Sequence, residues 1–277
     1  MEKSFSRRMG ITQPVPIQIG GMNAPLKNSI WNELVRFFEL STKESFVAVS
    51  AQNFFKVVLD FVPLNYPSNA KEWLRKSYED LPWWQVYDFL QFASDCCGKA
   101  GGSNFRRKFE NRINEILKRE NSGYSFINGI ISPLSHEAEI EAIEEAISQS
   151  GKFGIHGAET HLNESLKLLG RKPDPDYRNS IKEAISAVES VVKCISGVDH
   201  GGLDKAFKVL DQKTTLHSAL KEGFMKLYGY TSDEDGIRHA IIDQPNVGLD
   251  EARFMVVACS AFVHFLISKA DAAGLLK

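Results

Sequence analysis

Apolar residues recur every three or four positions along most of the chain, and this spacing predicts helices. The first such segment begins near residue 23, where Leu26, Ile30 and Leu34 share one helical face. The cysteine- and glycine-rich stretch CCGKAGGS is expected to form a loop between two later helices. The further helices are expected at about 45–61, 69–77, 82–97, 103–120, 135–150, 156–169, 178–195, 202–211, 215–229 and 250–268.

One short stretch, YSFINGIIS, breaks the helical period. Its Asn128 and Gly129 stand between two runs of β-prone residues. A type I′ turn needs positive φ at both central residues, which Asn and Gly adopt readily, so a hairpin is predicted. The next segment, SHEAEIEAIEEAISQS, predicts an acidic helix with Ser135 as its N-cap. The predicted fold class is mainly α, with two helical parts joined by a region containing a small β-hairpin.

The segment GRKPDPD, residues 170–176, has two prolines in seven residues and is the best candidate for a linker. A regular amphipathic helix follows it. We therefore expect an N-terminal helical domain at 1–122, a connecting region with the hairpin at 123–173, and a helical bundle at 174–277. The apolar stripe of the helix after the linker comprises Ile181, Ala184, Ile185, Val188, Val191, Val192 and Ile195.

Charge and composition describe an ordinary globular chain of 277 residues, with 43% hydrophobic and 25% charged residues. The formal net charge of −2 provides no global field that would attract nucleic acid. Any RNA contact must use a local basic patch, and Arg106, Arg107 and Lys108 on the predicted helix 103–120 are the candidates. Nearby glutamates offset part of this charge, so a solvated helix face is the alternative interpretation.

The four cysteines, Cys96, Cys97, Cys194 and Cys259, show neither CxxC pairing nor Cys/His spacing typical of metal ligands. We expect no metal site, no cofactor and reduced thiols, as in a cytoplasmic protein. The first ten residues lack the apolar core of a secretory signal. The uncharged run 254–268 is shorter than the roughly 20 residues that span a bilayer, so we interpret it as a buried core helix without membrane contact.

The stretch GIRHAI places Arg238 directly before His239. Ser232 and Asp235 resemble a capping box, which would put the pair in the second turn of a helix. Arginine binds phosphate in a bidentate manner, and histidine transfers protons near neutral pH. The pair therefore suits phosphodiester chemistry. In the alternative interpretation, Arg238 pairs with the neighbouring acidic residues and His239 caps a backbone group.

Three segments resemble parts of a known family. The segments IKEAISAVESVVK and GIRHAI, the latter followed by DEARFMVVACSAFVHFLISK, are similar to HEPN-type helical domains of bacterial abortive-infection proteins of the AbiJ kind. The opening FSRRMGITQPVPIQIGGMNAPLKNSIWNEL resembles an N-terminal domain attached to them. The resemblance implies a C-terminal HEPN-like helical bundle, a homodimer and a role in antiviral defence.

Many HEPN domains are metal-independent ribonucleases whose motif is an arginine, a polar residue and a histidine a few positions further on. The resemblance thus implies Arg238 and His239 as catalytic residues, RNA as substrate and a regulatory or phage-derived protein as partner. This chain departs from the motif, because no histidine follows an arginine at the usual spacing and positions 243–245 hold Asp, Gln and Pro. A non-catalytic HEPN-like sensor or scaffold that binds RNA, a nucleotide or a protein is therefore the alternative.

Overall fold

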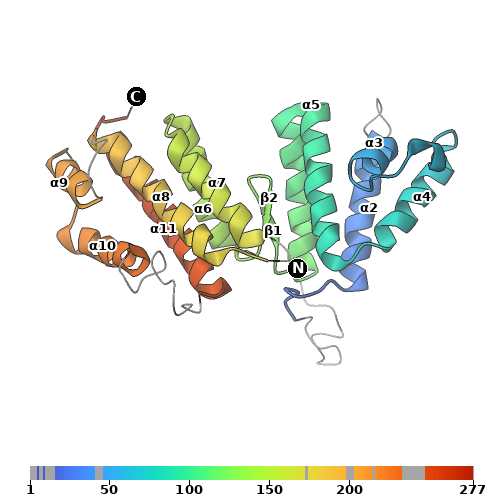
Figure 1. The fold of residues 1–277 in the computed structure, drawn as a ribbon, viewed down its shortest axis with the longest axis horizontal. Coiled ribbons are helices and arrows are strands. Elements are labelled where there is room, and N and C mark those ends of the chain that lie inside the picture. The colour runs from blue at the N-terminus through green and yellow to red at the C-terminus, as the bar shows by residue number, and fades with distance from the viewer. Residues whose placement is uncertain are drawn as a thin grey trace. The chain divides into compact units, whose positions relative to one another are not determined.

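A computed structural model describes residues 5, 9, 16–40, 46–171, 174–197, 203–213, 216–232 and 247–276. Within these residues lie ten α-helices and a two-stranded antiparallel ribbon, which confirms the predicted fold class (Figure 1). The chain divides into two compact units, residues 1–135 and 136–277.

Unit 1 holds four α-helices, one 3₁₀ turn and the ribbon in its described part. These are α2 (Ala24–Leu40), α3 (Phe46–Asn53), η1 (Leu59–Phe61), α4 (Pro67–Glu79), α5 (Trp83–Arg119), β1 (Ser125–Ile127) and β2 (Ile130–Ser132). Helix α2 begins where the Asn23 side chain accepts a hydrogen bond from the Leu26 amide at 2.9 Å. Its predicted apolar face is buried, since Leu26, Ile30 and Leu34 are at most 1% exposed.

The helix predicted at 45–61 is wrong in its second half, because α3 ends at Asn53. The carbonyl of Ser50 accepts hydrogen bonds from both the Phe54 and the Phe55 amides at 2.9 Å, and Lys56 takes a left-handed φ of 56°. This turn brings Phe54 and Phe55 onto Phe89, with ring centroids 4.9 and 5.6 Å apart. Burial of the rings against α5 therefore competes successfully with continuation of the helix.

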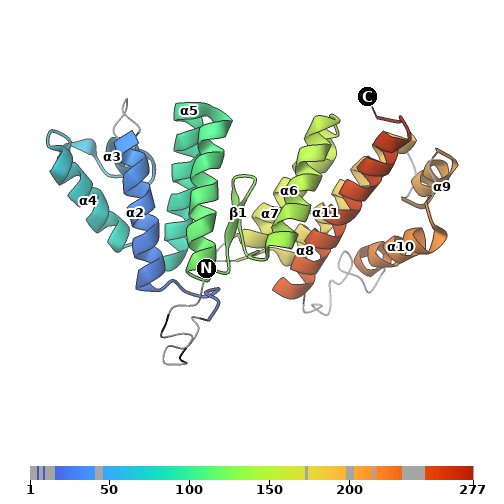
Figure 2. The ribbon, with the colours of Figure 1, turned by 180° about the vertical axis from the view of Figure 1, so that it is seen from behind.

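The loop predicted at CCGKAGGS is also wrong, because the helix continues through it and breaks at Gly102 alone. Gly102 has φ 73° and ψ −175°, a conformation that side-chain-bearing residues rarely adopt. The break folds α5 into two arms, 83–101 and 103–119, which run side by side in Figures 1 and 2. One sharp glycine turn replaces the expected loop.

The hairpin is confirmed at the predicted residues, with Phe126 opposite Ile131 and Ile127 opposite Ile130. Asn128 and Gly129 have φ of 46° and 82°, as a type I′ turn requires. Both outer edges receive side-chain amides from α5. Asn114 donates to the Phe126 carbonyl at 2.9 Å and accepts from its amide at 2.8 Å, while Gln91 accepts from the Ile131 amide at 2.9 Å.

Unit 2 is entirely helical in its described part. Its helices are α6 (Glu137–Lys152), α7 (His156–Gly170), α8 (Tyr177–Ser196), α9 (Leu203–Lys213), α10 (Ser218–Ser232) and α11 (Leu249–Ala272). The predicted apolar stripe of α8 is wholly buried, and the helix runs from an Asp176 N-cap to a left-handed Gly197 C-cap. Helices α7, α9 and α11 pack on α8, and α6 packs on α7 and α11.

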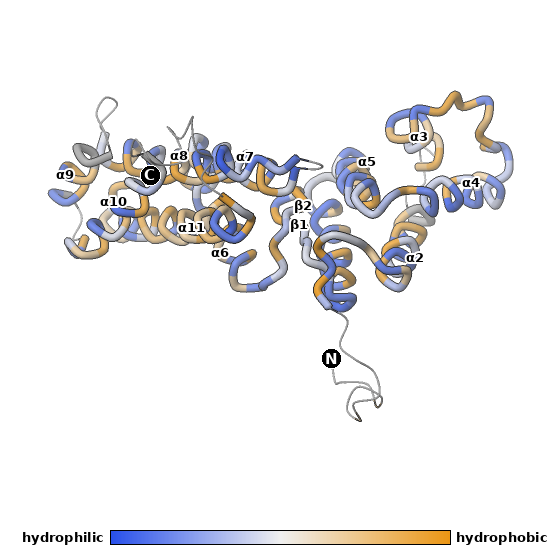
Figure 3. Tube along the Cα trace, turned by 60° about the horizontal axis from the view of Figure 1, so that its bottom comes forward, coloured by the Kyte–Doolittle hydropathy of each residue, from blue (hydrophilic) through white to orange (hydrophobic). Residues whose placement is uncertain are grey.

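The predicted core helix near the C-terminus is α11, which Figure 3 shows as apolar along much of its length. By length and composition it is the one described helix that meets the requirements of a membrane span, and half of its most apolar window is buried. Ten of its residues are buried in unit 2, among them Met255, Cys259 and Val263. Packing against α6, α7 and α8 accounts for its apolar composition.

The expected domain boundaries stay a prediction, and the compact units divide at another place, between residues 135 and 136. Helices α6 and α7, expected in a connecting region, pack with α8 and α11 instead, so the GRKPDPD segment lies inside unit 2. The predicted N-cap Ser135 is wrong as well, because α6 begins at Glu137 with His136 as N-cap. Side-chain contacts between helices, rather than the proline-rich composition of one turn, determine where the chain divides.

Candidate functional site

The predicted catalytic pair Arg238 and His239 lies outside the described residues, in the segment 233–246. Its two flanks are described. Helix α10 runs to Ser232, the residue expected to cap the next helix, and α11 begins at Leu249. The contacts that hold the start of α11, just after this segment, are therefore described.

The start of α11 is held by two carboxylates. Glu251 accepts a hydrogen bond from the Gly248 amide at 2.9 Å, and Gly248 is the N-cap of the helix. One turn further on, Arg253 donates from Nε at 2.9 Å and from Nη2 at 2.5 Å to Oε2 of Glu139 in α6. Both side chains of this pair are partly exposed. A charge-assisted double contact therefore fixes the first two turns of α11 to α6.

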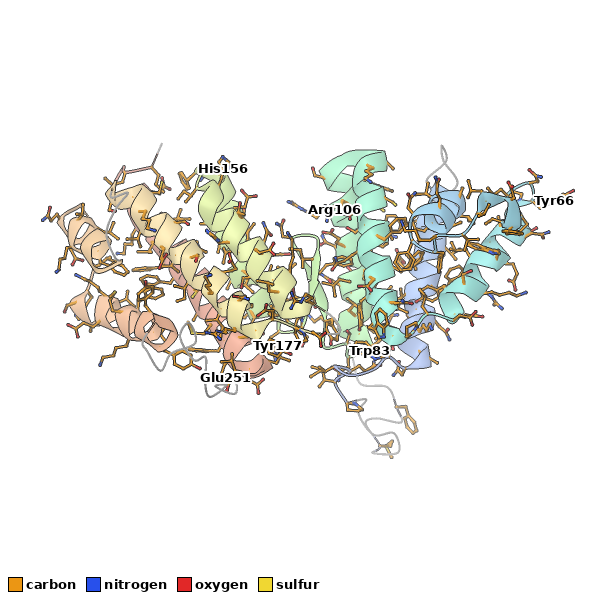
Figure 4. The ribbon with its side chains drawn as sticks, viewed as in Figure 1. Tyr66, Trp83, Arg106, His156, Tyr177 and Glu251 are labelled. Atoms are coloured by element: carbon orange, nitrogen blue, oxygen red, sulfur yellow. The ribbon has the colours of Figure 1, made fainter. Side chains whose placement is uncertain are left out.

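The same end of unit 2 carries the first turn of α8. In Figure 4 Tyr177 and Glu251, at the starts of α8 and α11, lie at one end of the helices, and His156, at the start of α7, lies at the other. Glu137 and Glu139 of α6 and Asp250 and Glu251 of α11 are first-turn carboxylates. Carboxylates stabilise the positive N-terminal ends of helices, and Arg253 neutralises the charge of one of them, Glu139.

Among the candidate RNA-binding residues, Arg106 is used inside unit 1. Its Nε donates to Glu110 at 2.8 Å and to Ser94 at 3.1 Å, and Ser94 donates to the same carboxylate at 2.5 Å. Its Nη2 lies 3.3 Å from Asp95 and 3.4 Å from the Gly129 carbonyl. Arg106 thus joins both arms of α5 to the turn of the ribbon. Its charge is matched by buried Glu110 and by Asp95 rather than presented to a ligand.

Arg107 and Lys108 differ from their neighbour. Both are exposed on the second arm of α5, and neither has an ion-pair or hydrogen-bond partner within the described parts of the chain. These two side chains are available to contact phosphate groups. A helical period places Arg106 beside Glu110 and its two neighbours on the exposed face, and RNA binding by the three residues stays a prediction.

The structure also joins residues that sequence reasoning left apart. His161 of α7 lies with Nδ1 2.6 Å from Oε2 of Glu183 in α8, and both side chains are partly exposed. The contact joins an imidazole ring on α7 to a carboxylate on α8. The two residues are 22 positions apart in sequence, and only the pairing of α7 with α8 brings them together.

The thiols offer little nucleophilic chemistry where they are buried. Burial raises the pKa of Cys97 in unit 1 to about 12, with contributions from Cys96 and Glu110, and burial raises the pKa of Cys259 in unit 2 to about 12. Such thiols stay protonated at neutral pH and are unreactive. In the described residues no group of three or more His, Cys, Asp or Glu side chains is placed to hold a metal ion.

Comparison with protein-family models shows which family the N-terminal part resembles. The AbiJ N-terminal domain 4 family matches residues 3–149, which is more than half of the chain and includes all of the ribbon and most of α6. No curated protein and no solved structure shows significant similarity to the chain. The matched segment contains both arms of α5, the contacts of Arg106 with Glu110 and Asp95, and the ribbon. The chain belongs to the AbiJ N-terminal domain 4 family.

Proposed function

We propose that this protein is a cytoplasmic antiphage effector that acts by abortive infection, and that its second unit carries the effector step as a HEPN-like bundle. Membership of the AbiJ N-terminal domain 4 family implies an abortive-infection context. The observation that carries the proposal is the two-unit organisation. A family-matched unit precedes a separate helical unit, most of which lies beyond the matched residues.

The proposed effector reaction is metal-independent cleavage of RNA. The 2′-hydroxyl of a ribose attacks the adjacent phosphate, so that a 2′-O–P bond forms and the P–O5′ bond breaks. His239 accepts the proton of the 2′-hydroxyl, and a proton is returned to the departing 5′-oxygen. Arg238 stabilises the negative charge on the phosphorane. Two copies of a single Arg-His pair are brought together in a homodimer, which makes a fuller site than one copy supplies.

The family domain supplies recognition in this proposal. The exposed side chains of Arg107 and Lys108 contact RNA phosphates, while Arg106 maintains the fold of the α5 hairpin. A regulatory or phage-derived protein acts as the trigger.

The test compares full-length wild type with Arg238→Ala and His239→Ala. Each protein is incubated with total bacterial RNA in EDTA, with and without phage lysate, and each is expressed in cells to score growth arrest. Arg75→Ala is the matched control, because Arg75 is an exposed arginine on α4 that forms only surface ion pairs. We expect cleavage and arrest by wild type and the control, and loss of both in the two site variants. RNA left intact by wild type in the presence of lysate rejects nuclease activity.

A second candidate is a non-catalytic HEPN-like sensor or scaffold. The observation that favours it is the missing motif histidine, since Asp243, Gln244 and Pro245 occupy the positions where it is usual. In that case Arg238 and His239 bind RNA, a nucleotide or a partner carboxylate. The same variants then weaken binding, and arrest occurs with no RNA fragments.

A further inference from the structure

One buried carboxylate in unit 1 holds two arginines from two helices. Arg36, one turn after Glu33 in α2, donates from Nη1 to Oε2 of Glu33 at 2.9 Å. Arg112, on the second arm of α5, donates from Nη1 to Oε1 of the same carboxylate at 3.1 Å. The Glu33 side chain is 7% exposed, whereas those of Arg36 and Arg112 are 62% and 49% exposed. These three residues, here called the Glu33 group, therefore present two guanidinium groups to solvent from one anchoring point.

The second arginine of the Glu33 group exceeds what charge neutralisation requires. A buried carboxylate destabilises the fold when it has no cation beside it, and one well-placed cation removes that penalty. Arg75 of α4 shows the opposite ratio, since it lies 3.4 Å from Glu72 and 3.6 Å from Glu79, both about half exposed. One arginine there serves two carboxylates, whereas two arginines share one carboxylate in the Glu33 group. The Glu33 group thus keeps an uncompensated positive charge.

The guanidinium of Arg112 is held in place by a second contact. Its central carbon lies 5.9 Å from the ring centroid of Phe37, a buried residue of α2. A guanidinium held by both a ring and a carboxylate loses less conformational freedom when it binds a ligand. The hydrogen bonds of Arg36 and Arg112 to Glu33 each use Nη1 alone, and a guanidinium has five N–H donors. The other donors suit the oxygens of a phosphate, which arginine binds in a bidentate manner.

Lys108 extends this positive surface along α5. It stands four residues before Arg112, so the two side chains are neighbours on one helical face. Lys108 is exposed and has no hydrogen-bond or ion-pair partner within the described residues. Together with the Glu33 group it makes three cations and one carboxylate, a net charge of +2. Cations spaced along a helix match a ligand with repeated anionic groups better than a single carboxylate.

We propose that Arg36, Lys108 and Arg112 form a phosphate site that binds the backbone of a single-stranded RNA. Such contacts position a strand without reading its bases. The assignment to RNA rests on the proposed function, whereas the binding of phosphate groups does not. The site adds two arginines, from helices far apart in sequence, to the exposed lysine.

The test measures binding of the full chain to a fluorescent single-stranded RNA by anisotropy at several salt concentrations. The riboses of this RNA carry 2′-O-methyl groups, so the proposed cleavage cannot consume it. Arg36→Ala and Arg112→Ala are each expected to lower the affinity about five- to tenfold. Each should also reduce the slope of its logarithm against the logarithm of salt concentration by about 0.7, the value for one phosphate contact on a single strand. Arg75→Ala is the matched control and should leave both quantities unchanged.

A purely structural role is separated by stability and by lysine variants. Each alanine variant leaves one arginine beside Glu33, so its midpoint of denaturant unfolding should stay near that of wild type. Wild-type affinity in both alanine variants overturns the site. If an alanine variant does not fold, Arg36→Lys and Arg112→Lys decide, because they keep the positive charge but lose the planar guanidinium. Weaker binding in these lysine variants supports the site, and wild-type affinity in both overturns it.

Two competitors identify the ligand class. Unlabelled RNA of the same sequence should displace the probe equally well with a 5′-phosphate or a 5′-hydroxyl, and a requirement for the 5′-phosphate contradicts contact with the strand. Polyglutamate at the same concentration of negative charge should compete poorly. If it binds as tightly as RNA and with the same dependence on Arg36 and Arg112, the surface is one for an acidic protein and the RNA site is overturned.

The outcome is independent of the effector assay. Cleavage of RNA or growth arrest by wild type, together with an affinity that does not depend on Arg36 or Arg112, rejects the phosphate site and leaves the proposed function standing. Binding that depends on both arginines, without cleavage or arrest, supports the phosphate site and rejects the proposed effector step.

Discussion

The aromatic cluster of unit 1 and the α7–α8 seam of unit 2 are packed in different ways, although unit 2 also holds a stacked pair of rings, Phe224 and Phe262, with centroids 4.1 Å apart. In unit 1 large rings fill the space between irregularly placed helices: Phe54, Phe55 and Phe92 all lie around Phe89, with ring centroids 4.9–6.1 Å from it. In unit 2 the α7–α8 pair approaches closely through small residues. Ser165 and Ser180 are fully buried and each donates to the other's carbonyl at 2.8 Å.

The difference in packing determines how much backbone irregularity each region tolerates. Large rings fill gaps of any shape, so unit 1 accepts the early end of α3 and the break at Gly102. The α7–α8 seam is closer, since a Cβ on Gly157 would lie 3.0 Å from Oγ of Ser190, which is tighter than an ordinary contact. Unit 1 is therefore expected to be sensitive to loss of volume and the α7–α8 seam to gain of volume.

Each unit contains a natural reporter for such experiments. Cys97 is buried in unit 1 and Cys259 in unit 2, and the pKa of each thiol is raised to about 12 by burial. Both thiols are protected in the folded state and react with a thiol reagent after unfolding. Labelling in a denaturant series, resolved by mass spectrometry of peptides, measures the free energy of unfolding of each unit separately.

The largest effect is expected for Phe89→Ala, which removes the ring at the centre of the aromatic cluster. A truncation of a fully buried phenylalanine costs about 3–5 kcal/mol of the free energy of unfolding. Labelling of Cys97 should shift to lower denaturant while that of Cys259 changes little. Phe61→Ala, at a ring that is 77% exposed, is the control and should change stability by less than about 0.5 kcal/mol. Equal shifts of both thiols would show that the cores are not separate.

A smaller effect is expected for Ser165→Leu in the α7–α8 seam. The larger side chain forces the helices apart and removes the hydrogen bond to Ser180, at a cost of about 1–3 kcal/mol. Labelling of Cys259 reports the change. Lys167→Leu introduces the same residue at an exposed position of α7 and should have little effect. A tolerated Ser165→Leu would disprove the close packing inferred for the seam.

The N-cap of α8 makes a pH-dependent contribution to unit 2. Burial raises the pKa of Asp176, but the hydrogen bonds from Asn179 and the charges of Arg171 and Arg178 outweigh burial and lower the pKa below its usual value. The folded state therefore binds the proton less tightly than the unfolded state, so the stabilisation is complete above the unfolded pKa near ~4 and disappears as pH falls through the lower folded pKa.

Asp176→Ala should accordingly destabilise unit 2 by about 1 kcal/mol at neutral pH. The difference from wild type should vanish in acid below the folded pKa, and denaturant unfolding at a series of pH values measures it. Asp174→Ala is the control, because its exposed side chain caps no helix. A difference that persists unchanged into strong acid would exclude the carboxylate as its source.

The smallest effect on stability is expected for the double variant Arg107→Ala with Lys108→Ala. Both residues are exposed, so the free energy of unfolding of unit 1 should change by less than about 0.5 kcal/mol. If these side chains contact phosphates, RNA affinity falls and the slope of its logarithm against the logarithm of salt concentration decreases by about 2. Filter binding at several salt concentrations measures this, with Arg75→Ala as control. An unchanged slope would show that Arg107 and Lys108 do not contact RNA phosphates.

The sequence by itself determined the features that depend on neighbours a few positions apart. The stripe of α8 is buried as its 3.6-residue period requires, and Asn128–Gly129 form the turn because few other residues accept positive φ. These features are local, since backbone geometry decides which side chains share a face. The N-terminal family segment was identified differently, by resemblance of its residues to an AbiJ-type domain, and the family match over residues 3–149 confirms it.

Only the tertiary structure decided the features that depend on partners far away in the chain. Arg106 contacts Gly129, His161 contacts Glu183, and Arg253 contacts Glu139. No spacing predicts these pairs, because each forms only after two elements have packed. The boundary between the units also follows from packing, since the interhelical contacts of α6 and not the prolines of residues 170–176 determine it. The burial of apolar surface between elements distant in sequence determines how the helices pack. The polar pairs then form between the side chains that this packing brings together.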